Sequence, residues 1–300
     1  MKPLAAIDLC CGGGGWACAA RGLPIQVLLA VDHWAPACKT YALNHPGTRV
    51  LYGDLREPAV AREIRAHRGV DLVVGGIPCE WLSVYRAFTK AGQVRAPERA
   101  AQRATLDSVL ALCAALAPRY WCLEDVIQIL PELPPLTPYQ IIDAQHYSGQ
   151  RRRRAYVGSF PSPRPERNPK TLAAYLRPGP FRIGARTASR DPATSRTFTT
   201  ETFYAAHADR KCPTVCAGGS RHDAEIALVC AVRGGKRQLE WQELAAAQGF
   251  PADYVFHGSP TDVAKMIGRA IQIDTGRAIL GAIVDAARHS TAPIVAESAD

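Results

Sequence analysis

A cysteine in the segment 75–83, Gly-Gly-Ile-Pro-Cys-Glu-Trp-Leu-Ser, has the setting of a nucleophile. The apolar run 70–74 before it is typical of a buried strand, and two glycines then allow a sharp turn. Pro78 stiffens the backbone that presents Cys79. Ligands bind at the carboxyl ends of strands in open α/β sheets, so this thiol is a nucleophile candidate. A lone cysteine is more often a small buried side chain, and the other motifs decide between the two interpretations.

Three acidic residues stand directly after predicted strands. Asp32 follows the second strand, about twenty residues beyond a glycine-rich loop at 10–15, where doubly wound folds bind a ribose diol. Asp54 follows the third strand, where it would meet an adenine amino group, and Glu124 ends a later buried strand. A strand, a glycine loop and a helix in succession bring backbone N–H groups to a nucleotide-like ligand. Tight turns also use glycine runs, so the loop alone is weak support.

The elements that must position these residues alternate between strands and helices. Helices are expected at 35–44, 58–67 and 97–116. In the last of these, apolar residues recur on one face at helical spacing. This alternation predicts a doubly wound, Rossmann-like α/β sheet over 1–159. The glycine loop, the acids and Cys79 at its strand ends make 1–159 the candidate catalytic and cofactor-binding domain. A small, irregular, mostly β domain at 160–250 is expected next. Helices returning to the catalytic domain (251–288) and a flexible tail (289–300) complete the predicted chain.

Composition narrows the class of protein. The chain has 300 residues, of which 47% are hydrophobic, and this is enough for one large domain and a small one. No apolar run reaches membrane-spanning length, and the N-terminus does not resemble a signal peptide. The ten cysteines are scattered without a Cys-x-x-Cys pair. We therefore expect reduced thiols, no structural metal and a cytoplasmic protein.

The positive charge is concentrated in one part of the chain. The net charge is +9, and residues 151–211 hold 14 Lys and Arg against 4 Asp and Glu, whereas the remainder is nearly neutral. A localised basic excess is typical of a protein that binds a polyanion. The competing interpretation is a solvated, charged linker, because Pro and Gly are frequent there.

Taken in order, the motifs resemble those of the DNA cytosine-5 methyltransferase family. A single match can arise by chance, but six in the right order are very specific, and only 160–235 resembles nothing in the family. The matching motifs are 8–15, Pro78-Cys79 with Ser83, Glu124-Asp125-Val126, Gln150 with Arg152 and Arg154, 248–251 with Tyr254 and Phe256, and 267–270.

The resemblance implies that S-adenosylmethionine is the methyl donor and that double-stranded DNA, with the target cytosine flipped out, is the substrate. It implies a prokaryotic or phage-encoded monomer whose variable 160–250 domain recognises the target. The residues that would bind the donor are Asp8, Cys10, Gly12, Gly14, Asp32, His33, Asp54, Pro78, Arg269 and Ala270.

The resemblance also implies the chemistry. The Cys79 thiolate would attack C6 of cytosine, and Glu124 would hydrogen-bond or protonate N3. Arg154 would hold the O2 atom of the base, and Arg152 would position the catalytic residues or the DNA backbone. Further residues expected on the substrate side or in the catalytic loop are Glu80, Ser83 and Gln150.

The chain departs from the family pattern at several positions, and Arg269 matters most. The family has Asn there, next to the donor, and a cation beside a sulfonium is unfavourable unless an anion is present. A guanidinium suits a carboxylate, so one hypothesis is a carboxy-S-adenosylmethionine donor that would yield 5-carboxymethylcytosine. The alternative is an ordinary donor, with Arg269 paired to Glu80, Asp125 or a DNA phosphate. Cys10 also replaces a Phe that packs on the donor in the family.

Two further function classes remain open at this point. One is an RNA cytosine-5 methyltransferase, because that branch of the family shares the nucleophile and the acid. The other is a catalytically inactive DNA-binding relative, suggested by Glu80 and Asp125 in place of the usual amides. The retained Cys79, Glu124 and Arg154 argue against an inactive protein.

Overall fold

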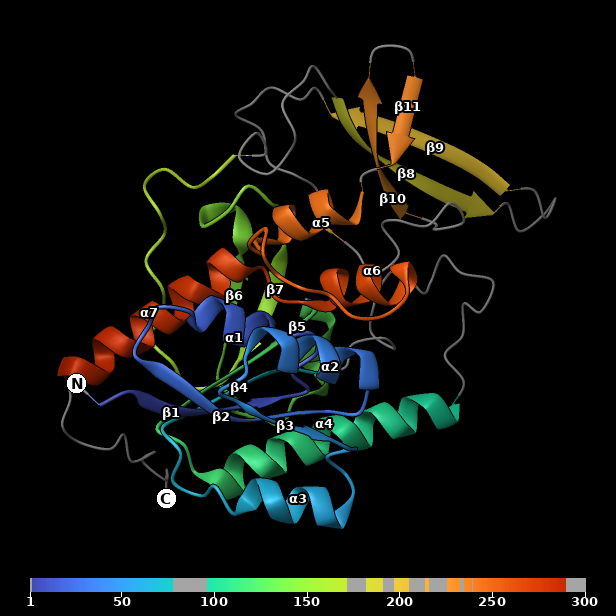
Figure 1. Cartoon of the computed structure of the whole chain (residues 1–300). Coiled ribbons are helices and arrows are strands. Elements are labelled where there is room, and N and C mark those ends of the chain that lie inside the picture. Colours follow the sequence, from blue (N-terminus) through green and yellow to red (C-terminus); the bar gives the residue numbers. More distant parts are fainter. Residues whose placement is uncertain are drawn as a thin grey trace.

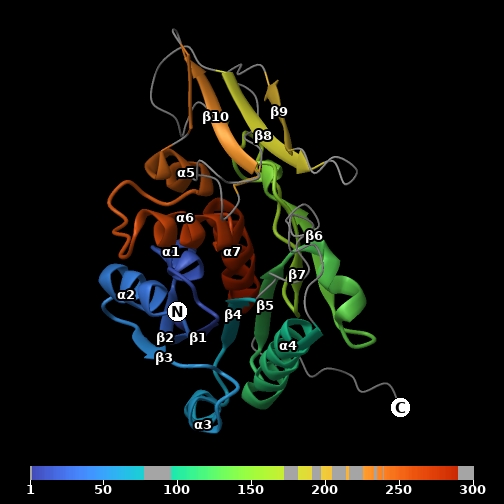
Figure 2. The same ribbon diagram turned by 90° about the vertical axis from the view of Figure 1, so that its right-hand side faces the viewer.

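The computed structural model describes residues 2–77, 96–171, 182–190, 197–204, 214–215, 226–232, 235–238 and 240–289. Within them, a seven-stranded sheet carries helices on both faces, and a four-stranded sheet stands beyond α5 and α6 (Figures 1 and 2). The seven-stranded sheet belongs to the α/β class that the sequence predicts.

The larger sheet has the strand order β3-β2-β1-β4-β5-β7-β6. Its first five strands are parallel, whereas β7 is antiparallel to both β5 and β6. The strands are β1 (Leu4–Leu9), β2 (Ile25–Asp32), β3 (Arg49–Tyr52), β4 (Leu72–Gly76), β5 (Tyr120–Asp125), β6 (Tyr139–Asp143) and β7 (Arg153–Val157).

The two faces of the sheet are covered by different helices. On one side α1 packs against α7 and α5 against α6, and on the other α3 packs against α4 (Figure 2). The helices are α1 (Gly15–Ala20), α2 (Ala35–Asn44), α3 (Pro58–Arg65), α4 (Ala96–Leu116), α5 (Trp241–Gln248), α6 (Pro260–Arg269) and α7 (Ile273–His289). Two 3₁₀ turns, Ile127–Glu132 and Ala144–His146, flank β6. None of the described helices is long and apolar enough to cross a membrane.

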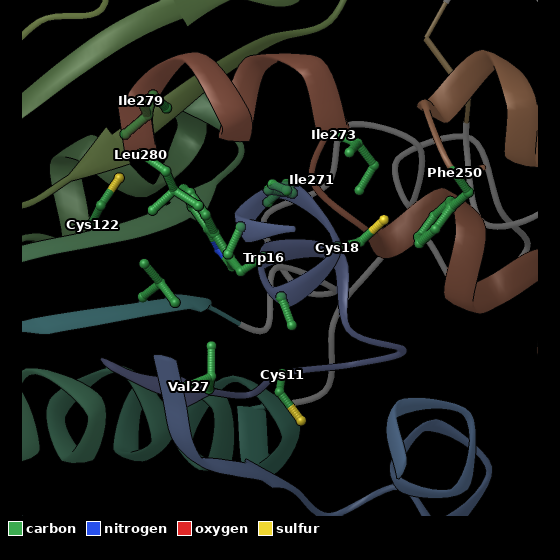
Figure 3. Close-up of a cluster of buried hydrophobic side chains, with 14 of the residues drawn as sticks. Cys11, Trp16, Cys18, Val27, Cys122, Phe250, Ile271, Ile273, Ile279 and Leu280 are labelled. Carbon is green, nitrogen blue, oxygen red and sulfur yellow. The ribbon is translucent and has the colours of Figure 1, made fainter. Parts of the chain in front are cut away.

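Each face has its own hydrophobic core because the central strands are apolar on both sides. On the α1 and α7 face, Trp16 from α1 lies among Ile271 and Leu280 from the C-terminal part of the chain (Figure 3). Its indole Nε1 donates a hydrogen bond to the Gly75 carbonyl at 3.0 Å. The C-terminal segment therefore packs into the core on the α1 and α7 face of the seven-stranded sheet.

The smaller sheet is antiparallel, with the order β11-β10-β8-β9. Its strands are β8 (Arg182–Arg190), β9 (Thr197–Tyr204), β10 (Ile226–Val232) and β11 (Gly235–Gln238). The sequence predicts a mostly β region here but not where its strands lie. The edge strand β6 was not predicted from the sequence. That strand is short and partly polar, so its periodicity is weak.

Candidate active site

A buried carboxylate at the end of β5 lies between two guanidinium groups. Glu124 is only 6% exposed. Its Oε1 atom is 3.2 Å from Nε of Arg154 and 3.7 Å from Nη2 of Arg152, and both contacts are ion pairs without hydrogen-bond geometry. The two cations offset the cost of burying the carboxylate.

Arg152 is a buried link between distant segments, with 4% of its surface exposed. Its Nη1 donates to the Val215 carbonyl at 3.0 Å. Its Nη2 donates to the carbonyls of Gly268 at 3.3 Å and of Ala270 at 3.1 Å. The position of Glu124 is thus fixed by a residue that also holds the end of α6.

Gln150 lies inside the protein rather than on its surface. Its amide nitrogen donates to the Ala247 carbonyl at 3.1 Å and to Oε1 of Gln248 at 3.0 Å, and the side chain is fully buried. Gln248 in turn donates to the Ala270 carbonyl. Through these contacts Gln150 joins the segment before β7 to α5. The resemblance implies a place on the substrate side.

The end of β4 lies beside Glu124. Gly76 pairs with Glu124 in the sheet, and the Ile77 amide donates to the Glu124 carbonyl at 3.0 Å. The predicted residues Pro78, Cys79, Glu80 and Ser83 come directly afterwards and lie outside the described residues. The ends of β4 and β5 are therefore adjacent.

The glycine loop and the end of β2 form a second part of the site. The Asp32 carboxylate accepts hydrogen bonds from the amides of Gly12 at 2.8 Å and Trp34 at 2.9 Å. Gly12 has φ +52°, and no atom lies within 4 Å of the place where its Cβ would stand. His33 beside it is largely exposed, with Nδ1 3.8 Å from Asp32. Open backbone next to a carboxylate suits the nucleoside part of a donor.

Asp54 is held by an arginine that the sequence analysis did not single out. Nε of Arg56 lies 2.9 Å and 3.0 Å from its two carboxylate oxygens. This hydrogen bonding lowers the pKa of Asp54. Nη1 of Arg56 also donates to the Ala101 carbonyl of α4 at 3.3 Å. The signal was local, because an acid followed two residues later by Arg can form such a pair.

Asp8 lies near the end of β1, and Cys10 is the first residue of the glycine loop. Asp8 is fully buried, and burial together with the Asp32 carboxylate raises its pKa well above the ordinary value. The Tyr41 hydroxyl is near enough to oppose that shift but lacks full hydrogen-bond geometry. Cys10, with φ +52°, is half-buried against the core of the α3 and α4 face. Asp8 is therefore enclosed by protein and lies near Asp32 rather than solvent.

Arg269, at the end of α6, is exposed and stacks on an indole. Its guanidinium carbon is 5.5 Å from the centre of the Trp34 ring, a cation–π distance. Trp34 is the N-cap residue of α2 and is itself half-buried against the core. Ala270, which follows Arg269, accepts from both Arg152 and Gln248 through its carbonyl. The Arg269 guanidinium therefore lies against Trp34, whose backbone amide is hydrogen-bonded to Asp32.

Comparison with known families gives a match over most of the chain. The model of the C-5 cytosine-specific DNA methylase family matches residues 4–130 and 186–285. Type II methyltransferase M.AgeI of Thalassovita gelatinovora is 40% identical over 84 residues, which are 26% of this chain and 19% of that protein. Type II methyltransferase M.NgoMIV of Neisseria gonorrhoeae is 25% identical over 154 residues, 51% of this chain and 44% of that protein. The chain spans less than half the length of either relative.

Solved structures agree on the fold. DNMT2 of Spodoptera frugiperda, in a mutant form, superposes with a TM-score of 0.63 at 14% identity, covering 93% of this chain and 99% of that one. Dnmt2 of S. pombe gives a TM-score of 0.62 at 15% identity, covering 95% and 99%. At such identities the likeness establishes the architecture alone.

Proposed function

Because the chain belongs to the C-5 cytosine-specific DNA methylase family, we propose that it transfers a one-carbon group to C5 of cytosine in double-stranded DNA. The observation that carries this proposal is Glu124, a buried acid between Arg152 and Arg154 at the strand edge where the Cys79 segment begins. We propose that the enzyme acts as a monomer and that 160–250 recognises the target.

The donor we propose is S-adenosylmethionine, and the residues present fit it. Gly12 leaves open space beside the loop, and the carboxylates of Asp32 and Asp54 end the two strands where a ribose and an adenine would be held. When bound, the donor supplies an electrophilic methyl group on its sulfonium. The chain itself must then make C5 of cytosine nucleophilic.

Cys79 and Glu124 are proposed to activate the base. The Cys79 thiolate forms a bond to C6, and the electron pair of the C5–C6 double bond moves toward N3, where the Glu124 carboxyl proton stabilises it. This leaves C5 with enamine character. Once C5 carries the new group, water removes the C5 proton and the C6–S bond breaks, which regenerates Cys79. Arg154, 3.2 Å from Glu124, is proposed to hold O2 of the base.

The test is a transfer assay on unmodified duplex DNA, read by nucleoside mass spectrometry. The wild type should form 5-methylcytosine, and Cys79→Ser should not. Cys113→Ala, which changes a cysteine in the core of the α3 and α4 face, should remain active. Product formation by Cys79→Ser would contradict the mechanism. Duplex binding without turnover by the wild type would favour the inactive DNA-binding relative, and a preference for tRNA would favour the RNA branch.

A second candidate donor, carboxy-S-adenosylmethionine, is favoured by the contact between Arg269 and Trp34. The indole holds a permanent cation beside the segment that binds the donor, and a guanidinium pairs well with a carboxylate. Incubation with each donor should give 5-carboxymethylcytosine from the carboxylated one. Arg269→Asn should lose this product, whereas Lys265→Asn, one turn earlier on α6, should keep it. Formation of 5-methylcytosine alone, unchanged by Arg269→Asn, would leave the ordinary donor.

A further inference from the structure

A tyrosine from near the end of the chain reaches the glycine loop. Tyr254 is 5% exposed, and its hydroxyl donates to the Gly13 carbonyl at 2.6 Å, with the Gly14 carbonyl at 3.3 Å. Burial raises the pKa of this phenol well above its ordinary value, so the proton stays on the oxygen. The hydroxyl therefore donates its one proton chiefly to the Gly13 carbonyl, at the turn that leads into α1.

His45 completes the same contact. Its Nε2 is 3.1 Å from the Tyr254 oxygen. The phenol proton is directed to Gly13, so His45 must donate its own Nε2 proton. Burial and the nearby Arg21 lower the pKa of His45 to about 4, which keeps the ring neutral.

The shape of the loop is matched to this hydroxyl. Gly14 has φ +91°, a conformation that side chains rarely adopt. A Cβ there would stand 2.6 Å from the Tyr254 oxygen and 3.1 Å from the His45 ring. The loop thus closes on the phenol itself and leaves no room for another group.

The residues after Tyr254 are fastened to α2. Asn44 forms two hydrogen bonds with the Val255 backbone, at 2.7 Å and 2.9 Å. Thr40 accepts from the His257 amide at 2.9 Å. Because α2 starts at Ala35, three residues after Asp32, one short segment holds both the glycine loop and the helix that follows the acid proposed to bind the ribose.

We propose that Tyr254 is a positioning residue for the donor site, acting through the carbonyls of Gly13 and Gly14. Its hydroxyl fixes the turn so that the Gly12 amide and Asp32 keep their relative places. Tyr254 also lies between α5, which follows the four-stranded sheet, and α6, which ends at Arg269. The inference rests on the proposed function, because it requires that the loop binds an S-adenosylmethionine-type molecule.

The test compares Tyr254→Phe with the wild type. The ring is retained, so its packing on Phe250 and Phe256 remains and the protein should fold. Calorimetric titration of the free enzyme with S-adenosylhomocysteine should show affinity reduced about tenfold, because a buried carbonyl loses its donor. In the transfer assay the KM for the donor should rise similarly, with kcat and the KM for DNA within about twofold. Amide hydrogen exchange should accelerate in 12–20 but not in β5 or β7.

Two matched variants make the result specific. Tyr139→Phe, on the exposed edge strand β6, should bind like the wild type. Thr40→Val loosens the 254–257 segment without touching the phenol, and it should weaken binding less than Tyr254→Phe. Equal losses in Thr40→Val and Tyr254→Phe, or wild-type affinity in Tyr254→Phe, would overturn the inference. Failure of the wild type to bind S-adenosylhomocysteine would instead overturn the proposed function.

Discussion

Two carboxylates are buried at the ends of strands in the same sheet, and their surroundings differ. Asp8 on β1 has no hydrogen-bond partner for either oxygen among the described residues, and burial raises its pKa. Glu124 on β5 lies between the guanidinium groups of Arg152 and Arg154. Two acids of low exposure, 0% for Asp8 and 6% for Glu124, therefore have opposite electrostatic surroundings.

The difference shows that a strand end places an acidic side chain in the interior, whereas side chains from other elements determine whether its charged form is stabilised. Asp8 meets another acid, Asp32, and a phenol from α2, so its neutral form is favoured. Glu124 meets two cations from β7 and the residue just before it, which offset the cost of burying its charge. Four substitutions test this comparison.

Replacing Arg152 with Met should give the largest effect. It removes a buried cation from Glu124 and leaves the carbonyls of Val215, Gly268 and Ala270 without this donor. The free energy of unfolding should fall by about 3–5 kcal/mol, as expected when one partner of a buried pair is lost. Urea denaturation measures it. Arg153→Met, at the exposed neighbour, should change it by no more than about 0.5 kcal/mol, and equal effects would break the comparison.

Replacing Glu124 with Gln should come next, because two guanidinium groups then face a neutral amide. Stability should fall by about 2 kcal/mol, and transfer to DNA should slow at least about 100-fold through loss of the acid. Thermal unfolding and the transfer assay measure the two effects. Glu132→Gln, in a more exposed pair with Arg103, is the control and should lose no more than about 1 kcal/mol. A Glu124→Gln protein as active as the wild type would refute the assigned role.

The same chemical change at the other carboxylate should have the opposite sign. The pKa of Asp8 is higher in the folded protein than its ordinary 3.8, so wild-type stability is lost as pH rises between those two values. Asp8→Asn stays neutral and should stabilise the protein by about 1–3 kcal/mol at pH 8. The gain should vanish below the ordinary value.

Urea denaturation between about pH 3.5 and pH 8 would follow this gain across the range in which the linkage acts. Asp253→Asn, at an exposed site, is the control. A destabilised Asp8→Asn protein at pH 8 would mean that the charged form is used in the folded state.

Replacing Arg56 with Gln should have the smallest effect, because its pair with Asp54 is partly exposed. The loss should be no more than about 1 kcal/mol at pH 7. Asp54 has a lowered pKa, so the contribution is present above its ordinary value of 3.8 and disappears as pH falls through the lower folded one. Thermal unfolding at pH 7 and in acid checks this. A loss as large as that in Arg152→Met would show that exposure does not govern these pairs.

Much of the sheet was predictable from the sequence because its strands are apolar runs that end at glycine or an acid. Asp32, Asp54 and Glu124 all stand at strand ends, as expected. The contacts of Arg152 were not predictable, because its carbonyl partners lie 63 to 118 residues away. Sequence spacing carries no signal for a backbone acceptor.

Other features escaped prediction for local reasons. The edge strand β6 has weak alternation, and β8, β9 and β11 are rich in polar residues. The apolar run Ile226–Val232 that forms β10 was not singled out. Tyr254 was identified only as part of a motif, and its link to Gly13 depends on a turn 241 residues earlier. Positions that touch distant backbone are thus the ones a sequence leaves undetermined.

The antiparallel direction of β7 affects where functional side chains should be sought in such sheets. In the parallel strands β1 to β5, the candidate site residues lie at or after the carboxyl end of the strand. In β7 they come first, because the chain enters the layer from the side where the others leave it. A search confined to the ends of strands would find Glu124 but miss Arg152 and Arg154. The residues at the start of an antiparallel strand should therefore be searched as well.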